Sequence, residues 1–196
     1  MARRRIKNTR QARRPSRSAS ALLILDLISE FRFVDWRRVL AAATTIAPRV
    51  ARLAARARST GVAVIYVNDT GGQWESDQAA FIRRCVAPGA RGREVVNRIK
   101  PEPEDYFIFK LRHSGFYGTP LPQLLEKLGA RELILTGLTT HQCVLFTAMD
   151  AYVRDYRLVV PRDCIGAPSA TASRHGLFVL EHALMARTAL STSLRL

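Results

Sequence analysis

Three residues with chemically reactive side chains follow apolar segments that are typical of buried strands. Asp26 follows the first such segment, Lys110 ends a later one, and Cys143 lies just beyond a third. In a parallel sheet the carboxyl ends of neighbouring strands converge on one crevice, so we expect the three side chains to meet there. A thiol beside a carboxylate and an ammonium group provides what covalent catalysis by cysteine requires: a nucleophile, a base and an orienting cation.

Cys143 is predicted to lie in the first turn of a helix, directly after a strand-to-helix turn. Backbone N–H groups and the helix dipole at such a place favour a thiolate, so a lowered pKa is expected for this thiol. A free cysteine is also often a small buried apolar residue, and position alone leaves both interpretations open. Cys85 and Cys164 lie late in a helix and in a turn, and a structural role is expected for both.

The types of the other two residues favour a charge pair. The chain has 4 lysines against 27 arginines, yet Lys110 ends an apolar strand, where a compact, titratable ammonium group serves a purpose that arginine does not. Asp26 follows a buried strand, where a carboxylate costs several kcal/mol unless it is paired. The structural alternatives are a lysine that snorkels from the strand end and an aspartate that caps a helix or binds loop backbone.

The elements that must position these residues follow from an alternation of short β-branched runs with longer segments of helical periodicity. This alternation predicts crossover units around a parallel sheet, in a three-layer α/β/α fold with a six-stranded, mainly parallel sheet. Strands are expected at residues 21–27, 62–67, 106–110, 132–136, 158–160 and 188–191. Helices are expected at residues 36–58, 77–85, 120–128, 140–154 and 169–185, the first of them capped by Asp35 and kinked at Pro48.

The formal net charge of +15 is concentrated at the N-terminus, where the first 19 residues hold eight Lys or Arg residues and no acid. This composition predicts a disordered basic tail at residues 1–19, followed by one domain at residues 20–196. The tail also resembles an organelle transit peptide, and a solvated tail is the alternative. Three cysteines in no metal-ligand spacing, without a secretory signal or a membrane-spanning run, predict a cytoplasmic location.

From about residue 21 to its C-terminus the chain resembles the isochorismatase-like hydrolases, a superfamily that includes nicotinamidases, N-carbamoylsarcosine amidase and ureide or streptothricin hydrolases. Segments that are each weakly specific carry the resemblance, and together, in order and at strand ends, they are highly specific. They are residues 23–31 (LILDLISEF), 110–121 (KLRHSGFYGTPL), 135–144 (LTGLTTHQCV) and 147–151 (TAMDA). The resemblance implies the strand order 3-2-1-4-5-6.

The resemblance also implies roles for individual residues. Asp26 would be the general base, Lys110 its electrostatic partner and Cys143 the nucleophile. The bond between Leu138 and Thr139 would be cis, and the backbone N–H groups of Thr139 and Cys143 would form an oxyanion hole. True isochorismatases cleave a vinyl ether and lack the cysteine. The predicted activity is therefore hydrolysis of a C–N bond in a small amide, ureide or lactam, through a thioester.

The loop after the second strand bears on metals and on the substrate pocket. Nicotinamidases carry an aspartate and two histidines there as metal ligands, whereas this loop holds Asp69 but no histidine, so we expect neither a metal nor another cofactor. His113 near Lys110 is expected to be a surface residue. Large rings in loops near the site, with one amide, are the candidates for the pocket, and core packing of the rings is the alternative: Phe31, Asn68, Trp74, Phe116 and Tyr117.

The expected partners are a small-molecule substrate and further copies of the chain, since relatives commonly form homo-oligomers. No specific nucleic acid and no membrane span are expected. A competing hypothesis is a non-catalytic binding or regulatory module of the same fold, whose basic tail binds nucleic acid or an anionic membrane. Such binding depends on phosphate contacts and weakens steeply with salt. Deletion of residues 1–19 would abolish it and spare hydrolysis.

Overall fold

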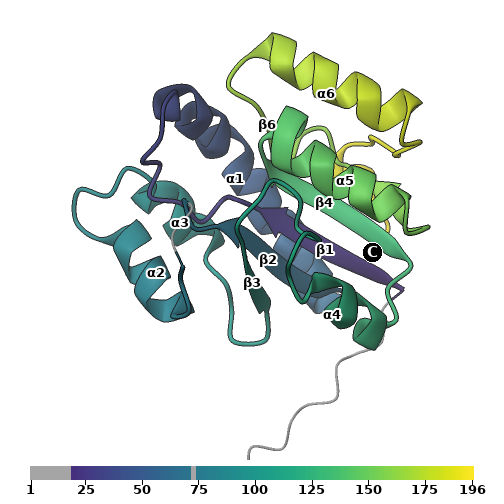
Figure 1. Ribbon diagram of the computed structural model, residues 1–196, viewed down its shortest axis with the longest axis horizontal. Helices are drawn as coiled ribbons and strands as arrows, with labels where there is room; N and C mark the ends of the chain where they lie inside the picture. Colours follow the sequence, from purple (N-terminus) through teal and green to yellow (C-terminus); the bar gives the residue numbers. More distant parts are fainter. Residues whose placement is uncertain (1–18, 72–73) are drawn as a thin grey trace, which may run out of the picture.

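The computed structural model describes residues 19–71 and 74–196, so the basic tail predicted at residues 1–19 lies outside the described residues except for Ala19. The described chain forms a parallel sheet in the strand order β3-β2-β1-β4-β5, with β6 paired to β4 (Figure 1). The strands are β1 (Ser20–Leu25), β2 (Ala63–Asp69), β3 (Tyr106–Lys110), β4 (Glu132–Leu138), β5 (Arg157–Val159) and β6 (Ile165–Gly166).

Helices cover both faces of this sheet, which gives the predicted three layers (Figure 1). One face packs against α1 (Trp36–Ser59), α2 (Gln78–Val86) and α3 (Arg93–Ile99). The other packs against α4 (Leu121–Leu128), α5 (Leu145–Tyr152) and α6 (Ala170–His182). A π-helical turn, η1 (Thr140–Val144), leads from β4 into α5, and a short 3-10 turn, η2 (Ser191–Ser193), lies near the C-terminus. No helix in the described part of the chain is long and apolar enough to cross a membrane.

The central strand β1 shows why its sequence is apolar without alternation. Leu22 and Ile24 face the core under α1 to α3, whereas Leu23 and Leu25 face the core under α4 to α6, and all four are fully buried. A strand covered on both faces needs apolar residues at every position. α1 needs them on one face only, and its buried residues recur at helical spacing: Val39, Ala43, Ile46, Ala47, Val50, Leu53, Ala54 and Ala57.

The predicted sixth strand at residues 188–191 is wrong. The isolated bridge nearby is made by Arg187, which precedes that segment and pairs with Val159, and the chain then enters η2. The sixth strand is β6, which pairs with Gly137 and Leu138 at the end of β4, so the implied order holds only for the first five strands. β5 stops early because Pro161 lacks the N–H group that a continuing strand would need.

Three helix predictions also need correction. α3 was missed, because it lies in a Pro- and Gly-rich stretch and is stabilised by packing of Val95, Val96 and Ile99. Asp35 holds the N-cap position of α1 in a left-handed conformation, but its side chain makes no capping hydrogen bond. The helix expected at residues 140–154 is divided into the π-helical η1 and the α-helical α5.

Gly137 allows β4 to lie against β1 immediately before the site. Its φ is +107°, and a Cβ atom there would lie 2.0 Å from the carbonyl oxygen of Leu25. We expect Gly137→Ala to lower the free energy of unfolding by about 3 kcal/mol or more, because strain and overpacking add. Gly61→Ala is the control: its φ is +78° but no atom lies within 4 Å, so a loss of only about 1 kcal/mol is expected. Equal losses in urea denaturation would contradict this account.

Candidate active site

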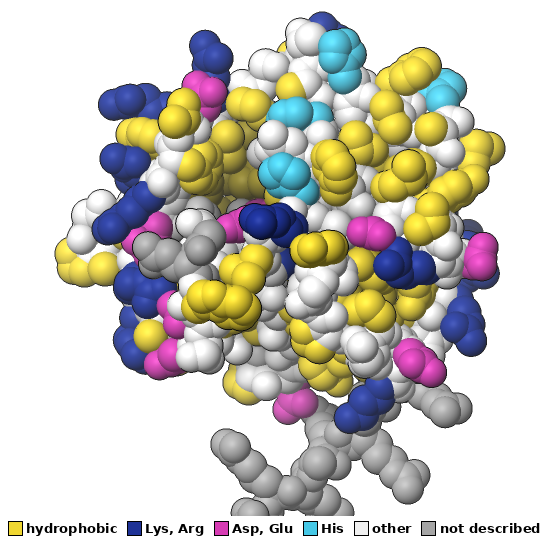
Figure 2. All heavy atoms as spheres, in the orientation of Figure 1, with side chains coloured by type: hydrophobic (Ala, Val, Ile, Leu, Met, Phe, Trp, Pro, Cys, Tyr) yellow, Lys and Arg dark blue, Asp and Glu magenta, His cyan; other side chains and the backbone are white. Residues whose placement is uncertain are grey.

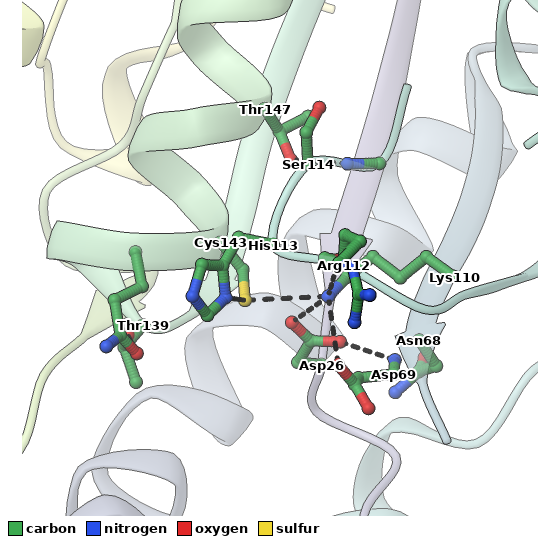
Figure 3. A network of polar contacts seen from close by, with 12 residues as sticks. Asp26, Asn68, Asp69, Lys110, Arg112, His113, Ser114, Thr139, Cys143 and Thr147 are labelled. Carbon is green, nitrogen blue, oxygen red and sulfur yellow. Dashed lines mark hydrogen bonds and ion pairs between the residues drawn. The ribbon is translucent and has the colours of Figure 1, made fainter. Parts of the chain in front are cut away.

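The structure brings Asp26, Lys110 and Cys143 together at the carboxyl end of the sheet (Figure 3). The ammonium nitrogen Nζ of Lys110 lies 2.9 Å from Oδ2 of Asp26 and 3.5 Å from Sγ of Cys143. Asp26 directly follows β1, Lys110 ends β3 and Cys143 lies in η1 after β4. Three separate crossover units thus supply one group each.

Lys110 is the buried centre of this cluster, with a side chain that has no exposed surface. Its Nζ also donates to the carbonyl oxygen of Arg112 at 3.1 Å, and Oδ2 of Asp69 lies 3.8 Å away. Burial, the largest effect, opposes the charge, but Asp26, Cys143 and Asp69 together outweigh it and raise the pKa of Lys110. The lysine is therefore an ammonium ion at neutral pH, as the ion pair requires.

Asp26 is held by backbone hydrogen bonds in a left-handed conformation with a φ of 53°. Its N–H donates to the carbonyl of Val67 at 3.1 Å, and its Oδ1 accepts from the N–H of Asp69 at 2.6 Å. Burial raises the pKa of Asp26, and Lys110 offsets part of that rise. A carboxylate with a raised pKa is a stronger base than an exposed one, which suits it to accept a proton from a thiol.

The pKa of Cys143 corrects a sequence-based expectation. Burial first, and then the negative charge of Asp26, raise the pKa of the Cys143 thiol above its ordinary value, and Lys110 offsets only part of the rise. The expected lowering rested on the N-terminal turn of a helix and left out the effects of burial and of Asp26 on the pKa of the thiol. The thiol of Cys143 is therefore harder to deprotonate than an exposed thiol.

This result predicts the pH dependence of alkylation. In the wild-type protein, labelling of Cys143 by iodoacetamide should rise at a higher pH than labelling of a free thiol, which titrates near pH 8.5. Mass spectrometry of the separate peptides gives the profile, with the buried Cys85 and Cys164 as internal references. Half-maximal labelling of Cys143 below pH 8 would show that the thiolate forms at rest and contradict the raised pKa.

Backbone hydrogen bonds to Thr139 hold the turn that carries Cys143. The carbonyl oxygen of Thr139 accepts from the N–H groups of Gln142 and Val144, at 3.0 and 3.2 Å. The peptide bond between Leu138 and Thr139 is cis, as the family resemblance implied. The oxyanion hole assigned to the N–H groups of Thr139 and Cys143 stays a prediction.

The expected pocket residues lie in different surroundings. Phe31 and Phe116 are buried within the two apolar cores, which matches the core-packing alternative. Trp74 and Tyr117 are 91% and 68% exposed. Asn68 is fully buried at the end of β2; its Nδ2 donates to the carbonyl of Ile28 at 2.7 Å, and its Oδ1 has no partner. Contact of these residues with a substrate stays a prediction.

His113 lies closer to Cys143 than the sequence indicated. It is exposed, as expected of a surface residue, but its Nδ1 lies 3.8 Å from Sγ of Cys143 and its ring packs on Phe146 with centroids 5.5 Å apart. Its position three residues after Lys110 was the available signal, because a segment that starts at the site has little length in which to leave it.

In residues 19–71 and 74–196, no cluster of three or more metal-binding side chains is present.

Comparison with known proteins identifies the family of this chain. The model of the isochorismatase domain matches residues 20–192. The chain belongs to the isochorismatase family. This isochorismatase-family protein is 38% identical over 172 residues to an uncharacterised isochorismatase family protein, YaaI, of Bacillus subtilis, a match that covers 87% of this chain and 93% of YaaI. It is 29% identical to the ureidoacrylate amidohydrolase RutB of Methylorubrum extorquens, over 81% of this chain and 74% of RutB.

A solved structure of a related amidase has the same fold as this chain. The N-carbamoylsarcosine amidase of Thermoplasma acidophilum superposes with a TM-score of 0.69 at 27% identity, over 91% of this chain and 99% of the amidase. The superfamily inferred from sequence motifs is therefore confirmed, and so is the three-layer fold. As a member of the isochorismatase family, this protein is an enzyme, a hydrolase.

Proposed function

We infer that the protein is a cysteine-dependent hydrolase that cleaves the C–N bond of a small amide, ureide or lactam through a thioester. The observation that carries this inference is the position of the Cys143 sulfur, 3.5 Å from a lysine that is itself paired with Asp26 at 2.9 Å. Two relatives support the reaction class, since their names describe a ureidoacrylate amidohydrolase and an N-carbamoylsarcosine amidase.

The first half-reaction forms the thioester. Asp26 takes the proton of Cys143, and the sulfur adds to the substrate carbonyl to give a tetrahedral oxyanion. Backbone N–H groups of Thr139 and Cys143 bind this oxyanion, each contributing about 3–4 kcal/mol in comparable sites. When the intermediate collapses, the C–N bond breaks and protonated Asp26 gives its proton to the departing nitrogen.

The second half-reaction returns the enzyme to its resting state. Asp26, again a carboxylate, takes a proton from water, and the resulting hydroxide adds to the thioester carbonyl. The C–S bond then breaks, the acid product leaves and the sulfur recovers its proton from Asp26. Lys110 stays protonated throughout and balances whichever of its two neighbours carries negative charge.

The thioester itself provides the test. Primary amides, ureido acids and lactams are screened for turnover, and a productive reaction is quenched in acid and digested. The peptide that holds Cys143 should then carry the acyl mass of the substrate, while the peptides of Cys85 and Cys164 remain unmodified. Turnover without any acyl adduct on Cys143, even at saturating substrate and early times, would count against covalent catalysis.

A further inference from the structure

Two basic side chains lie beside the candidate active site, in the segment that follows β3. Arg112 and His113 are both exposed, and the bond from Lys110 Nζ to the carbonyl of Arg112 anchors this segment to the site. Figure 3 shows the ring of His113 beside the sulfur of Cys143, and Arg112 beside Lys110. In Figure 2, histidine side chains and a Lys or Arg side chain meet near the centre of this face.

Arg112 lacks a counter-ion among the residues that the structure describes. Its guanidinium makes only a long contact, 3.4 Å from Nη1 to the carbonyl of the adjacent Leu111. Other exposed arginines, such as Arg84 and Arg154, pair with carboxylates instead. A guanidinium group presents a fork of N–H donors that matches a carboxylate, so Arg112 is free to bind one from a ligand.

Figure 3 shows the carboxylates of Asp26 and Asp69 on the opposite side of the Cys143 sulfur from the ring of His113. Asp26 and Asp69 are within 2.9 and 3.8 Å of Lys110, which offsets their charge. His141, close to His113 in the fold, stays neutral, because burial and then the neighbouring His113 lower the pKa of His141. An incoming anion therefore meets hydrogen-bond donors on the side where Arg112 and His113 lie.

We propose that Arg112 and His113 recognise a carboxylate on the substrate, so that this enzyme prefers amides or ureides that also carry a carboxylate group. This inference rests on the proposed function, because it names the substrate class of the same active site. The sulfur of Cys143 attacks the substrate carbonyl. The carboxylate at the other end of the substrate binds Arg112 and His113 and fixes the orientation of the substrate.

A matched pair of alkylating agents tests this recognition without any substrate. Iodoacetate and iodoacetamide react at the same carbon with the same leaving group, and only iodoacetate is an anion. Their rate constants for Cys143 are measured at pH 7 by peptide mass spectrometry, and the iodoacetate-to-iodoacetamide ratio is divided by the ratio for N-acetylcysteine amide, a thiol that carries no other charge. We expect a normalised ratio of about 3 or more, since local positive charge raises the encounter rate of anions.

Variants assign the effect to the two residues. Arg112→Gln and His113→Gln should each lower the normalised ratio, and the double variant should bring it to about 1. Arg131→Gln is the matched control, because it removes one exposed arginine at the opposite end of β4 and should leave the ratio unchanged. A wild-type ratio of 1 or less, or a ratio that survives the double substitution, overturns the proposal.

The outcome is distinguishable from failure of the proposed function. A high ratio that depends on both residues, in a protein that hydrolyses no amide, ureide or lactam, would leave anion recognition standing and remove the proposed C–N hydrolysis. Conversely, hydrolysis that is faster for a neutral diamide such as succinamide than for succinamate, together with a ratio near 1, would keep the hydrolase and remove the carboxylate preference.

Discussion

Replacement of Cys143 by alanine should lower kcat/KM on any substrate found by at least about 10³-fold, because no other group in the site can form the covalent intermediate. The fold should survive. The Asp26–Lys110 pair is untouched, and Cys143 is only half-buried, so the free energy of unfolding should change by less than about 1 kcal/mol. Steady-state kinetics and urea denaturation on the same preparation measure both quantities.

Two comparisons make this result specific. Cys85→Ala removes a thiol buried in the apolar core under α1 to α3, so it should lower stability but retain kcat per folded molecule. Cys143→Ser keeps the shape of the nucleophile but has a hydroxyl in place of the thiol, and its activity should fall nearly as far as that of the alanine variant. Full activity in Cys143→Ser would show that the sulfur is not the attacking atom.

Asp26→Asn should separate two properties of the thiol that normally change together. Hydrolysis should fall by roughly 10²–10⁴-fold, since the base that takes and returns the proton is lost. Alkylation of Cys143 should nevertheless move to lower pH. The negative charge of Asp26 raises the pKa of Cys143 and the ammonium of Lys110 lowers it, so removal of the carboxylate leaves only the lowering effect of the two.

Peptide-resolved alkylation between pH 6 and pH 10, beside a turnover assay, tests this separation. The control is Asp69→Asn, whose carboxylate lies 3.8 Å from Lys110 and is 39% exposed; it should change both measurements less. A variant that merely unfolds would also expose Cys85 and Cys164, which are buried in the wild type, to the reagent. Slower alkylation of Cys143 with the other two still protected would contradict the electrostatic account.

Sequence patterns predicted the parts of this structure that local periodicity determines. β1 could be found because a strand buried on both faces is apolar at each position, and α1 because its buried residues recur at helical spacing. β6 could not, because two residues have no periodicity and are held as a strand by pairing with the end of β4. α3 depends in the same way on tertiary packing.

Some features of the site could likewise be predicted from sequence and others could not. The convergence of Asp26, Lys110 and Cys143 follows from strand ends in a parallel sheet, which sequence can indicate. The direction of the Cys143 pKa shift could not be found that way, because its largest cause is the depth at which the sulfur is buried, which depends on the packing around it. The closeness of His113 to the sulfur depends on the path of one loop, which residue types alone do not determine.

The origin of the three groups in three crossover units has a consequence for the protein during its synthesis. The carboxylate of Asp26 is made early, the ammonium of Lys110 later and the thiol of Cys143 last. Only strand pairing from β3 through β2 and β1 to β4 brings them within reach of one another. A nascent chain therefore carries an ordinary cysteine, and the proposed hydrolytic activity can arise only when the sheet is complete. On the proposed mechanism, measurable hydrolysis therefore indicates that the chain has completed its sheet.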